Sequence, residues 1–102
     1  MHIQTAVRDG QAVVSLAGAF DFNAHRDFRQ AYEGLLDAQG VRSLELDLAQ
    51  VDYVDSSALG MLLILRDKAQ AHGKQVILSR PRSTVRQVLE IANFGKLFPV
   101  RD

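Results

Sequence analysis

Two adjacent serines, Ser56 and Ser57, are the residues of this chain whose surroundings best suit a chemical modification. They follow Asp55 and precede a strongly apolar stretch that begins at Ala58. A serine or aspartate directly before an apolar helix is typical of an N-cap, and the positive end of the helix dipole also favours an aspartate there. The same helix end could accommodate a phosphate, which adds about −1.5 to −2 charges to a serine. The position is therefore open to a structural and a regulatory interpretation.

The helix expected after these serines has two apolar sides, although an ordinary surface helix has one. The stripe that we expect to face a sheet consists of Ala58, Leu62, Leu65 and Ala69. The opposite side, here called the docking face, consists of Gly60, Leu63, Ile64 and Asp67. A glycine inside a helix costs about 1 kcal/mol relative to alanine, and it lets another chain approach closely. The pattern predicts a docking face with a charge switch at its rim, because a phosphate there would disfavour an apolar or acidic partner.

The other chemistry-bearing residues favour no catalytic or metal site. A nucleophilic serine needs a nearby base, and the surroundings of Ser57 do not form a Gly-x-Ser-x-Gly elbow. His2, His25 and His72 have no spacing that suggests a triad or a metal site, and each is expected to be an exposed polar residue. The chain has no cysteine and no Gly-x-x-x-x-Gly-Lys-Ser/Thr phosphate loop. We therefore expect no enzyme, no metal and no cofactor.

The size and charge of the chain exclude further classes. Its 102 residues, 47% of them hydrophobic, predict a single globular domain over residues 1–102. Twelve basic and twelve acidic side chains cancel, and this balance disfavours general binding to nucleic acid or to anionic membranes. The longest apolar run is far shorter than the ~20 residues of a membrane span, and the first residues do not resemble a signal peptide. A cytoplasmic protein is expected.

One cluster of cations leaves a nucleic-acid alternative open. Arg80, Arg82 and Arg86 gather near the start of the last expected helix. A helix N-terminus favours acidic rather than basic residues, so the dipole does not explain this cluster. The plain interpretation is a solvated helix face, and a second is a contact with an acidic protein partner.

The elements that must position the serines can be read from periodicity and turn residues. Alternating residues on either side of Asp9-Gly10 predict a hairpin that Gly18 ends. Period-two leucines over 43–48 predict a strand with one buried face, and 75–79 predict a strand buried on both faces. The expected fold is α/β, a mixed four- to five-stranded sheet packed by three to four helices in the order β-β-α-β-α-β-α-(β).

Three helices are expected between and after these strands. The first has Asn23 as N-cap and Gly40 at its C-terminal end, with an apolar stripe at helical spacing. That stripe consists of Ala24, Phe28, Ala31, Leu35 and Ala38. The second follows Asp55-Ser56-Ser57, reaches about His72 and is closed by Gly73. The third is capped by Ser83 and stopped by Gly95, and residues 97–100 form a short terminal strand or tail.

The hexad Asp55-Ser56-Ser57-Ala58-Leu59-Gly60, together with the turn Gly18-Ala19-Phe20-Asp21 and the order of elements, resembles the STAS domain. More narrowly, the whole chain looks like the bacterial anti-sigma factor antagonists. Phe20-Asp21-Phe22 with His25 and Phe28-Arg29 is similar to a subgroup of stand-alone antagonists. Many relatives have glycine at the position of Ala58, and alanine, which is also small, should not change the role.

The resemblance implies a partner-switching protein of transcription regulation and signal transduction. In that family the unphosphorylated antagonist binds an anti-sigma factor, often itself a serine kinase, and so releases the sigma factor. The kinase inactivates the antagonist by phosphorylating a serine that matches Ser57, with Ser56 as the alternative, and a serine/threonine phosphatase reverses the modification. No nucleic acid or membrane partner is implied, and a monomer is favoured. The partner-binding residues expected on this basis are Asp21, Asp55, Ser56, Ala58, Gly60, Leu63, Ile64 and Asp67.

A second role within the same family remains open at this point. Some STAS domains are scaffold or adaptor subunits in stressosome-like assemblies or in lipid transporters. These proteins often lack the serine pair, so the presence of Ser56 and Ser57 favours the phosphorylation switch.

Overall fold

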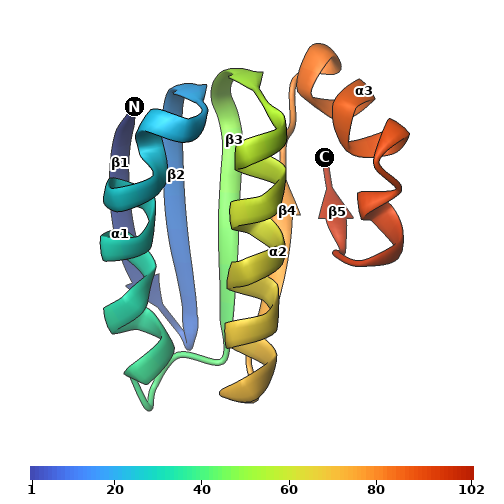
Figure 1. The fold of residues 1–102 in the computed structure, drawn as a ribbon. Coiled ribbons are helices and arrows are strands. Elements are labelled where there is room, and N and C mark those ends of the chain that lie inside the picture. Colours follow the sequence, from blue (N-terminus) through green and yellow to red (C-terminus); the bar gives the residue numbers. More distant parts are fainter.

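A five-stranded sheet with the order β1-β2-β3-β4-β5 organises the chain (Figure 1). The structure, a computed structural model, describes all residues from 1 to 102. β1 and β2 are antiparallel, and β2, β3, β4 and β5 are parallel to one another. The strands are β1 (His2–Arg8), β2 (Gln11–Phe20), β3 (Ser43–Val54), β4 (Gln75–Ser79) and β5 (Val100–Arg101). The expected mixed sheet and element order are confirmed.

Helices connect the parallel strands, as parallel pairing requires. α1 and α2 lie side by side over one face of the sheet, and α3 lies beyond β4, next to β5 (Figure 1). The helices are α1 (His25–Asp37), α2 (Ser56–Ala71) and α3 (Ser83–Ile91), with short 3-10 turns η1 (Phe22–Ala24) and η2 (Phe94–Lys96).

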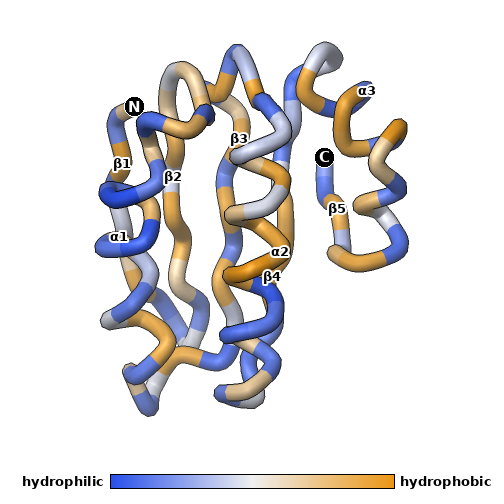
Figure 2. The backbone as a smooth tube through the Cα atoms, viewed as in Figure 1, coloured by the Kyte–Doolittle hydropathy of each residue, from blue (hydrophilic) through white to orange (hydrophobic).

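The core lies between the sheet and these helices. Leu44, Leu46 and Leu48 of β3 are buried in alternation with half-buried polar residues, as their spacing predicts. Three consecutive residues of β4, Val76 to Leu78, are buried, which confirms a strand enclosed on both faces. Figure 2 shows hydrophobic residues along the strands and in the middle turns of α2, and hydrophilic residues in its last turns. The sheet therefore presents a fixed apolar surface on which α2 rests.

The turns of the hairpin behave partly as expected. Asp9 and Gly10 have φ values of 52° and 82°, and two successive positive φ angles are those of a tight hairpin turn that fits the twist of the strands. Gly18 does not end β2, which continues to Phe20. The register with β3 shifts on both sides of Gly18, whose φ is 98°. Glycine here permits an irregularity inside a longer strand.

The expected caps of the first helix are wrong. Asp21, not Asn23, caps this segment, because its Oδ1 accepts a hydrogen bond of 2.9 Å from the Asn23 N–H at the start of η1. At the other end α1 stops before Gly40, and Lys74 reaches across from the start of β4. Its Nζ donates to the carbonyls of Leu35 and Ala38 at 2.8 and 2.7 Å. A distant lysine therefore satisfies the carbonyls for which a local glycine was expected.

The buried side of α1 also differs from the expected stripe. Tyr32 and Leu36 are buried with Ala24 and Phe28, whereas Ala31, Leu35 and Ala38 are only half-buried. The helix is therefore rotated so that its longer side chains meet the core. Phe28 packs its ring against the neighbouring aromatic rings of Phe20 and Tyr32.

The last helix is close to the expected range but has different ends. α3 begins at Ser83, so the N-cap position belongs to Arg82, which makes no side-chain capping bond. The helix ends at Ile91, and Asn93 adopts a left-handed conformation with φ of 60° before η2. Asn93 rather than Gly95 therefore redirects the chain, since asparagine tolerates this conformation better than most residues.

Asp47 and Arg80 form an ion pair at the carboxyl end of β4. The Arg80 guanidinium donates to Asp47 Oδ2, and the Ala49 N–H donates to Asp47 Oδ1 at 3.0 Å. Burial raises the pKa of Asp47, but the Arg80 hydrogen bond, the Ala49 hydrogen bond and the Arg80 charge outweigh it and hold the pKa below its usual range. The carboxylate is thus more easily ionised in the folded chain than in the unfolded one.

We predict that Arg80→Gln raises the pKa of Asp47 and destabilises the fold in a pH-dependent way. A lowered folded-state pKa stabilises the fold above the unfolded-state value of about 3.9, and this stabilisation is lost as the pH falls through the folded-state value. The variant should therefore have a lower free energy of unfolding than the wild type at pH 7, and this difference should be smaller at pH 3. Urea unfolding at both pH values and an NMR titration of the Asp47 carboxyl measure this, with Arg8→Gln as the control. An unchanged Asp47 titration in Arg80→Gln would contradict the assignment.

Candidate functional site

Asp55 begins α2 and organises the site. It has an extended backbone with φ of −111° and ψ of −178°, and its Oδ1 accepts a hydrogen bond of 2.9 Å from the Ala58 N–H. Its carbonyl accepts the Leu59 N–H at 3.2 Å. This is the geometry of an N-cap, because the side chain satisfies an N–H that has no partner inside the helix. The structural interpretation of Asp55 is therefore confirmed.

The same carboxylate also holds the turn that follows β2. Asp55 Oδ2 accepts a hydrogen bond of 3.3 Å from the Phe22 N–H, and the Asp55 N–H donates to the Phe20 carbonyl at 3.3 Å. Asp21, the residue between these two phenylalanines, uses its own carboxylate on the Asn23 N–H. Asp21 and Asp55 are therefore brought to the same end of the sheet, where Asp21 binds the main chain with one carboxylate oxygen and Asp55 with both.

The two serines occupy the first turn of α2. Ser56 is exposed and Ser57 is half-buried, so both residues are accessible from the surface at this end of the helix. Ser56 and Ser57 are the first two helical residues, where the N–H groups have no partner inside the helix. These N–H groups and the helix dipole favour an anion, whereas the Asp55 carboxylate beside them opposes it. A phosphate here would project charge outward from the end of the helix.

The two sides of α2 separate as the spacing predicts. Ala58, Leu62, Leu65 and Ala69 are all buried against the sheet. On the docking face, Ile64 is 47% exposed, Leu63 and Asp67 are also exposed, and Gly60 is partly exposed. A Cβ added to Gly60 would meet no atom within 4 Å, so no part of this chain uses the space that the glycine leaves. The open side of α2 is available to another molecule.

One expected partner contact is wrong. Ala58 is 0% exposed, because its side chain belongs to the buried stripe of α2, so this side chain lies out of reach of a partner. Its contribution at the site is its N–H, which Asp55 binds. The small size of the residue therefore serves close packing of the helix on the sheet.

Two exposed aromatic residues at this end escaped the sequence-based list of partner contacts. Phe22 is 70% exposed, and Tyr53 at the end of β3 is 54% exposed. Tyr53 also borders a shallow hollow lined by Val85 and Val88 of α3. Phe20 is the last residue of β2 and is buried, whereas Phe22 begins η1 and is exposed, and no local pattern in the sequence marks this difference. Exposed aromatic rings are common anchors of protein interfaces.

Of the remaining chemistry-bearing residues, His2 and His25 are exposed, whereas His72 and the three arginines near α3 make contacts within the fold. No group of three or more His, Asp or Glu side chains could hold a metal ion. His72 Nε2 lies 3.3 Å from Asp37 Oδ1, and His72 Nδ1 lies 2.8 Å from the Lys68 carbonyl oxygen. Arg80 pairs with Asp47, as described above. Arg82 donates to the Ala49 carbonyl at 2.8 Å, and Arg86 pairs with Asp102. None of the helices is long and apolar enough to span a membrane.

Comparison with known proteins gives a family for this geometry. A family model described as "Mlab, STAS domain" matches residues 3–99. A STAS-domain containing protein of Pseudomonas aeruginosa is 46% identical over 93 residues, which are 90% of each chain. BtrV of Bordetella bronchiseptica, described as a candidate anti-sigma factor antagonist, is 28% identical over 92 residues, 90% of this chain and 78% of that protein.

The fold has solved counterparts as well. The Bacillus cell fate determinant SpoIIAA in its phosphorylated form superposes with a TM-score of 0.74 at 22% identity, covering 97% of this chain and 90% of that one. SpoIIAA in its unphosphorylated form, described as an anti-sigma factor antagonist, gives the same TM-score and identity over 99% of this chain and 87% of that one. At this identity the likeness establishes the fold.

We predict that Asp55→Ala lowers the free energy of unfolding by about 1–2 kcal/mol, because an N-cap bond and a second main-chain bond are lost. Asp55→Asn should lose less, since its amide oxygen can still accept one of them. Urea unfolding measures the difference. Asp52→Ala, at an exposed acidic residue with no side-chain hydrogen bond in the structure, is the control. Equal losses for Asp52→Ala and Asp55→Ala would contradict the role of the cap.

Proposed function

The chain belongs to the STAS domain family, and we propose that it acts there as an anti-sigma factor antagonist controlled by phosphorylation of Ser57. The unphosphorylated form binds an anti-sigma factor or switch kinase, and the phosphorylated form does not. Ser56 is the alternative acceptor. The chain performs no chemistry of its own in this scheme, since a kinase adds the phosphate and a serine/threonine phosphatase removes it.

The observation that carries this proposal is the position of the serine pair. Ser56 and Ser57 begin α2 beside the docking face, and Phe22 lies at the same end of the molecule. Leu63 and Ile64 are large apolar side chains exposed to water, and such exposure is typical of a surface that another molecule covers. The names of BtrV and SpoIIAA, which are those of anti-sigma factor antagonists, and the existence of a phosphorylated SpoIIAA support the same conclusion.

The physical basis of the switch is the charge of one residue next to an apolar surface. The folded chain has no net charge at pH 7, so about −2 added at Ser57 would dominate the local field. The helix N-terminus limits the cost within the chain itself. A partner that covers the first turns of α2 with apolar or acidic groups would have to bury or oppose the phosphate, and either is costly.

We expect Ser57→Ala to abolish phosphorylation and to keep partner binding, whereas Ser57→Asp should weaken binding. A like-charge or desolvation penalty of about 1.4 kcal/mol corresponds to a tenfold loss of affinity. Affinity capture from native lysate with both variants, followed by calorimetry on the protein that is enriched, measures the difference. Ser56→Ala is the matched control, because it removes the neighbouring hydroxyl from the same turn.

The outcomes separate the switch from an adaptor role. Partners enriched on the alanine form alone would name the pathway. A phosphopeptide centred on any residue other than Ser57 would overturn the site assignment. Equal capture by Ser57→Ala and Ser57→Asp would instead favour a STAS adaptor whose assembly does not depend on phosphorylation.

Gly60→Leu should impair docking and leave the domain folded. The added side chain projects into open space, so it meets no atom of the chain but occupies the position that a partner would use. We expect at least a tenfold weaker affinity by calorimetry, with unchanged circular dichroism. Gly34→Leu on α1, where a Cβ also meets no atom, is the matched control. Unchanged affinity in Gly60→Leu would count against the docking face.

A further inference from the structure

The pairing between β4 and β5 stops early, and the cause is a proline. Only Leu78 with Val100 and Ser79 with Arg101 are paired. The Leu78 N–H donates to the Pro99 carbonyl at 2.9 Å, and the Arg80 N–H donates to the Arg101 carbonyl at 2.8 Å. In the next step of this parallel ladder, the Val76 N–H would donate to the Leu97 carbonyl, and the N–H of residue 99 would donate to the Val76 carbonyl. Pro99 has no N–H, so this step cannot be completed.

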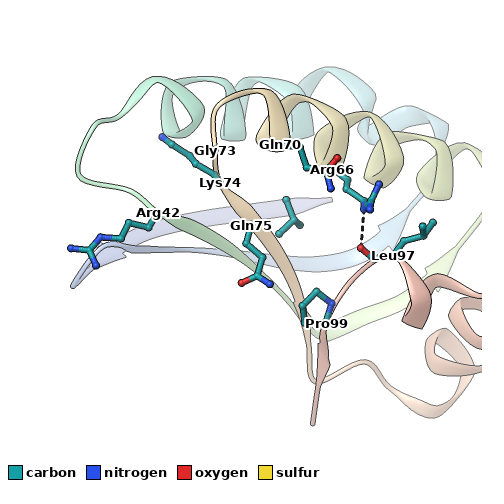
Figure 3. Close-up of a pocket in the computed structure, with 9 residues that line it drawn as sticks. Arg42, Arg66, Gln70, Gly73, Lys74, Gln75, Leu97 and Pro99 are labelled. Atoms are coloured by element: carbon teal, nitrogen blue, oxygen red, sulfur yellow. Dashed lines mark hydrogen bonds between the residues drawn. The ribbon is translucent and has the colours of Figure 1, made fainter.

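The second missing bond has its own explanation. The Leu97 carbonyl, which would accept the Val76 N–H, accepts Arg66 Nε at 2.8 Å instead (Figure 3). The Val76 N–H and carbonyl, which point toward the outer edge of the sheet, therefore pair with no strand. The residue is only 4% exposed overall, and it is one of the residues that line a cavity at this edge. Buried main-chain groups without partners are rare in folded proteins, and each one calls for a ligand, a water or a partner chain.

A cavity of about 350 Å³ lies at this edge of β4. Its walls are the last turns of α2 on one side and the segment that leads into β5 on the other (Figure 3). The residues that line it are Arg42, Arg66, Gln70, Gly73, Lys74, Gln75, Val76, Leu97 and Pro99. Arg66 and Gln70 lie about 14–20 Å along α2 from Ser57, so the cavity is separate from the proposed switch.

The charge of this lining is one-sided. Three of the nine residues are cationic and none is acidic, in a chain whose charges otherwise balance. Lys74 Nζ donates to two carbonyls at the end of α1. Arg66 donates to the Leu97 carbonyl through Nε alone, so its two terminal nitrogens are available to another partner. Near the C-terminal end of α2, the carbonyls of Lys68, Ala69 and Gln70 are bound by the N–H groups of residues 72–74. The net field in the cavity therefore favours an anion.

We propose that this edge binds an extended acidic segment of a partner protein, which adds a short strand beside the first half of β4. In an antiparallel arrangement, one residue of that segment would accept the Val76 N–H and donate to the Val76 carbonyl. An adjacent aspartate or glutamate would bind Arg66. A small anion satisfies the N–H but leaves the carbonyl unpaired, so a peptide accounts for both open groups of Val76.

An NMR titration of the ¹⁵N-labelled full chain tests this with defined peptides. The probe is the N-acetylated, C-amidated peptide Val-Glu-Val-Glu-Val. We expect saturable shifts of the Val76 amide and the Arg66 Nε–H signals. The lysine counterpart of the probe, and the probe N-methylated at its central valine, should not produce them. Arg66→Gln should weaken binding about fivefold, as for a partly exposed arginine–carboxylate pair, and Arg26→Gln on the outer face of α1 should not.

A second variant removes the cause of the open edge. Pro99→Ala supplies the missing N–H, so β5 can extend toward Val76, and we expect the chain to stay folded and the probe to stop binding. An unmoved Val76 amide at the solubility limit of the probe would overturn the proposal. Equal Val76 shifts with acetate or inorganic phosphate would overturn it in favour of a small-anion site. Ser57→Asp should bind the probe as the wild type does, so this outcome is independent of the proposed switch.

Discussion

The carboxylate of Asp55 is shared between two main-chain N–H groups that lie 36 residues apart, those of Phe22 and Ala58. One oxygen starts α2 and the other fixes the turn after β2, so the helix and the turn cannot move independently. The sheet supplies the rigid base for this arrangement, because β2 and β3 are paired as far as Phe20 and Val54. Asp55 thereby positions the serine pair and the exposed Phe22, and the buried stripe of α2 on the sheet positions the docking face.

Local chemistry predicted the elements whose cause is local. The alternating leucines of β3, the Asp9-Gly10 turn and the Asp55 cap each depend on residues a few positions apart, and each is present. The expected ends of α1 failed because they depend on distant contacts. Its C-terminal carbonyls are bound by Lys74, 36 to 39 residues away, and no pattern near Gly40 contains that information. At this helix end a tertiary contact from a charged side chain replaces the local cap.

The candidate site shows the same division. Helical periodicity separated the buried side of α2 from the docking face, since a 3.6-residue repeat is a property of the helix alone. The same repeat placed Ala58 on the buried side, and the structure confirms this against the partner contact that the family resemblance implied. It could not show that Phe22 faces water, because that depends on how the first turn of α2 meets the end of β2. The open edge at Val76 was also not predictable from the sequence, since it results from Pro99 lying beside Val76, 23 residues earlier in the chain.

α2 is held at both ends, and this limits how the domain can respond to a modification. Asp55 ties its first turn to the β2 turn, and the chain that leaves its last turn is tied to α1 through Lys74. A helix fixed in this way transmits little displacement, so a charge added at Ser57 would act mainly through its field. That field decays in salt water within about 8 Å at physiological ionic strength. The domain would therefore report its state only to a molecule already in contact with it, and the ionic composition of the cell would set the range of the signal.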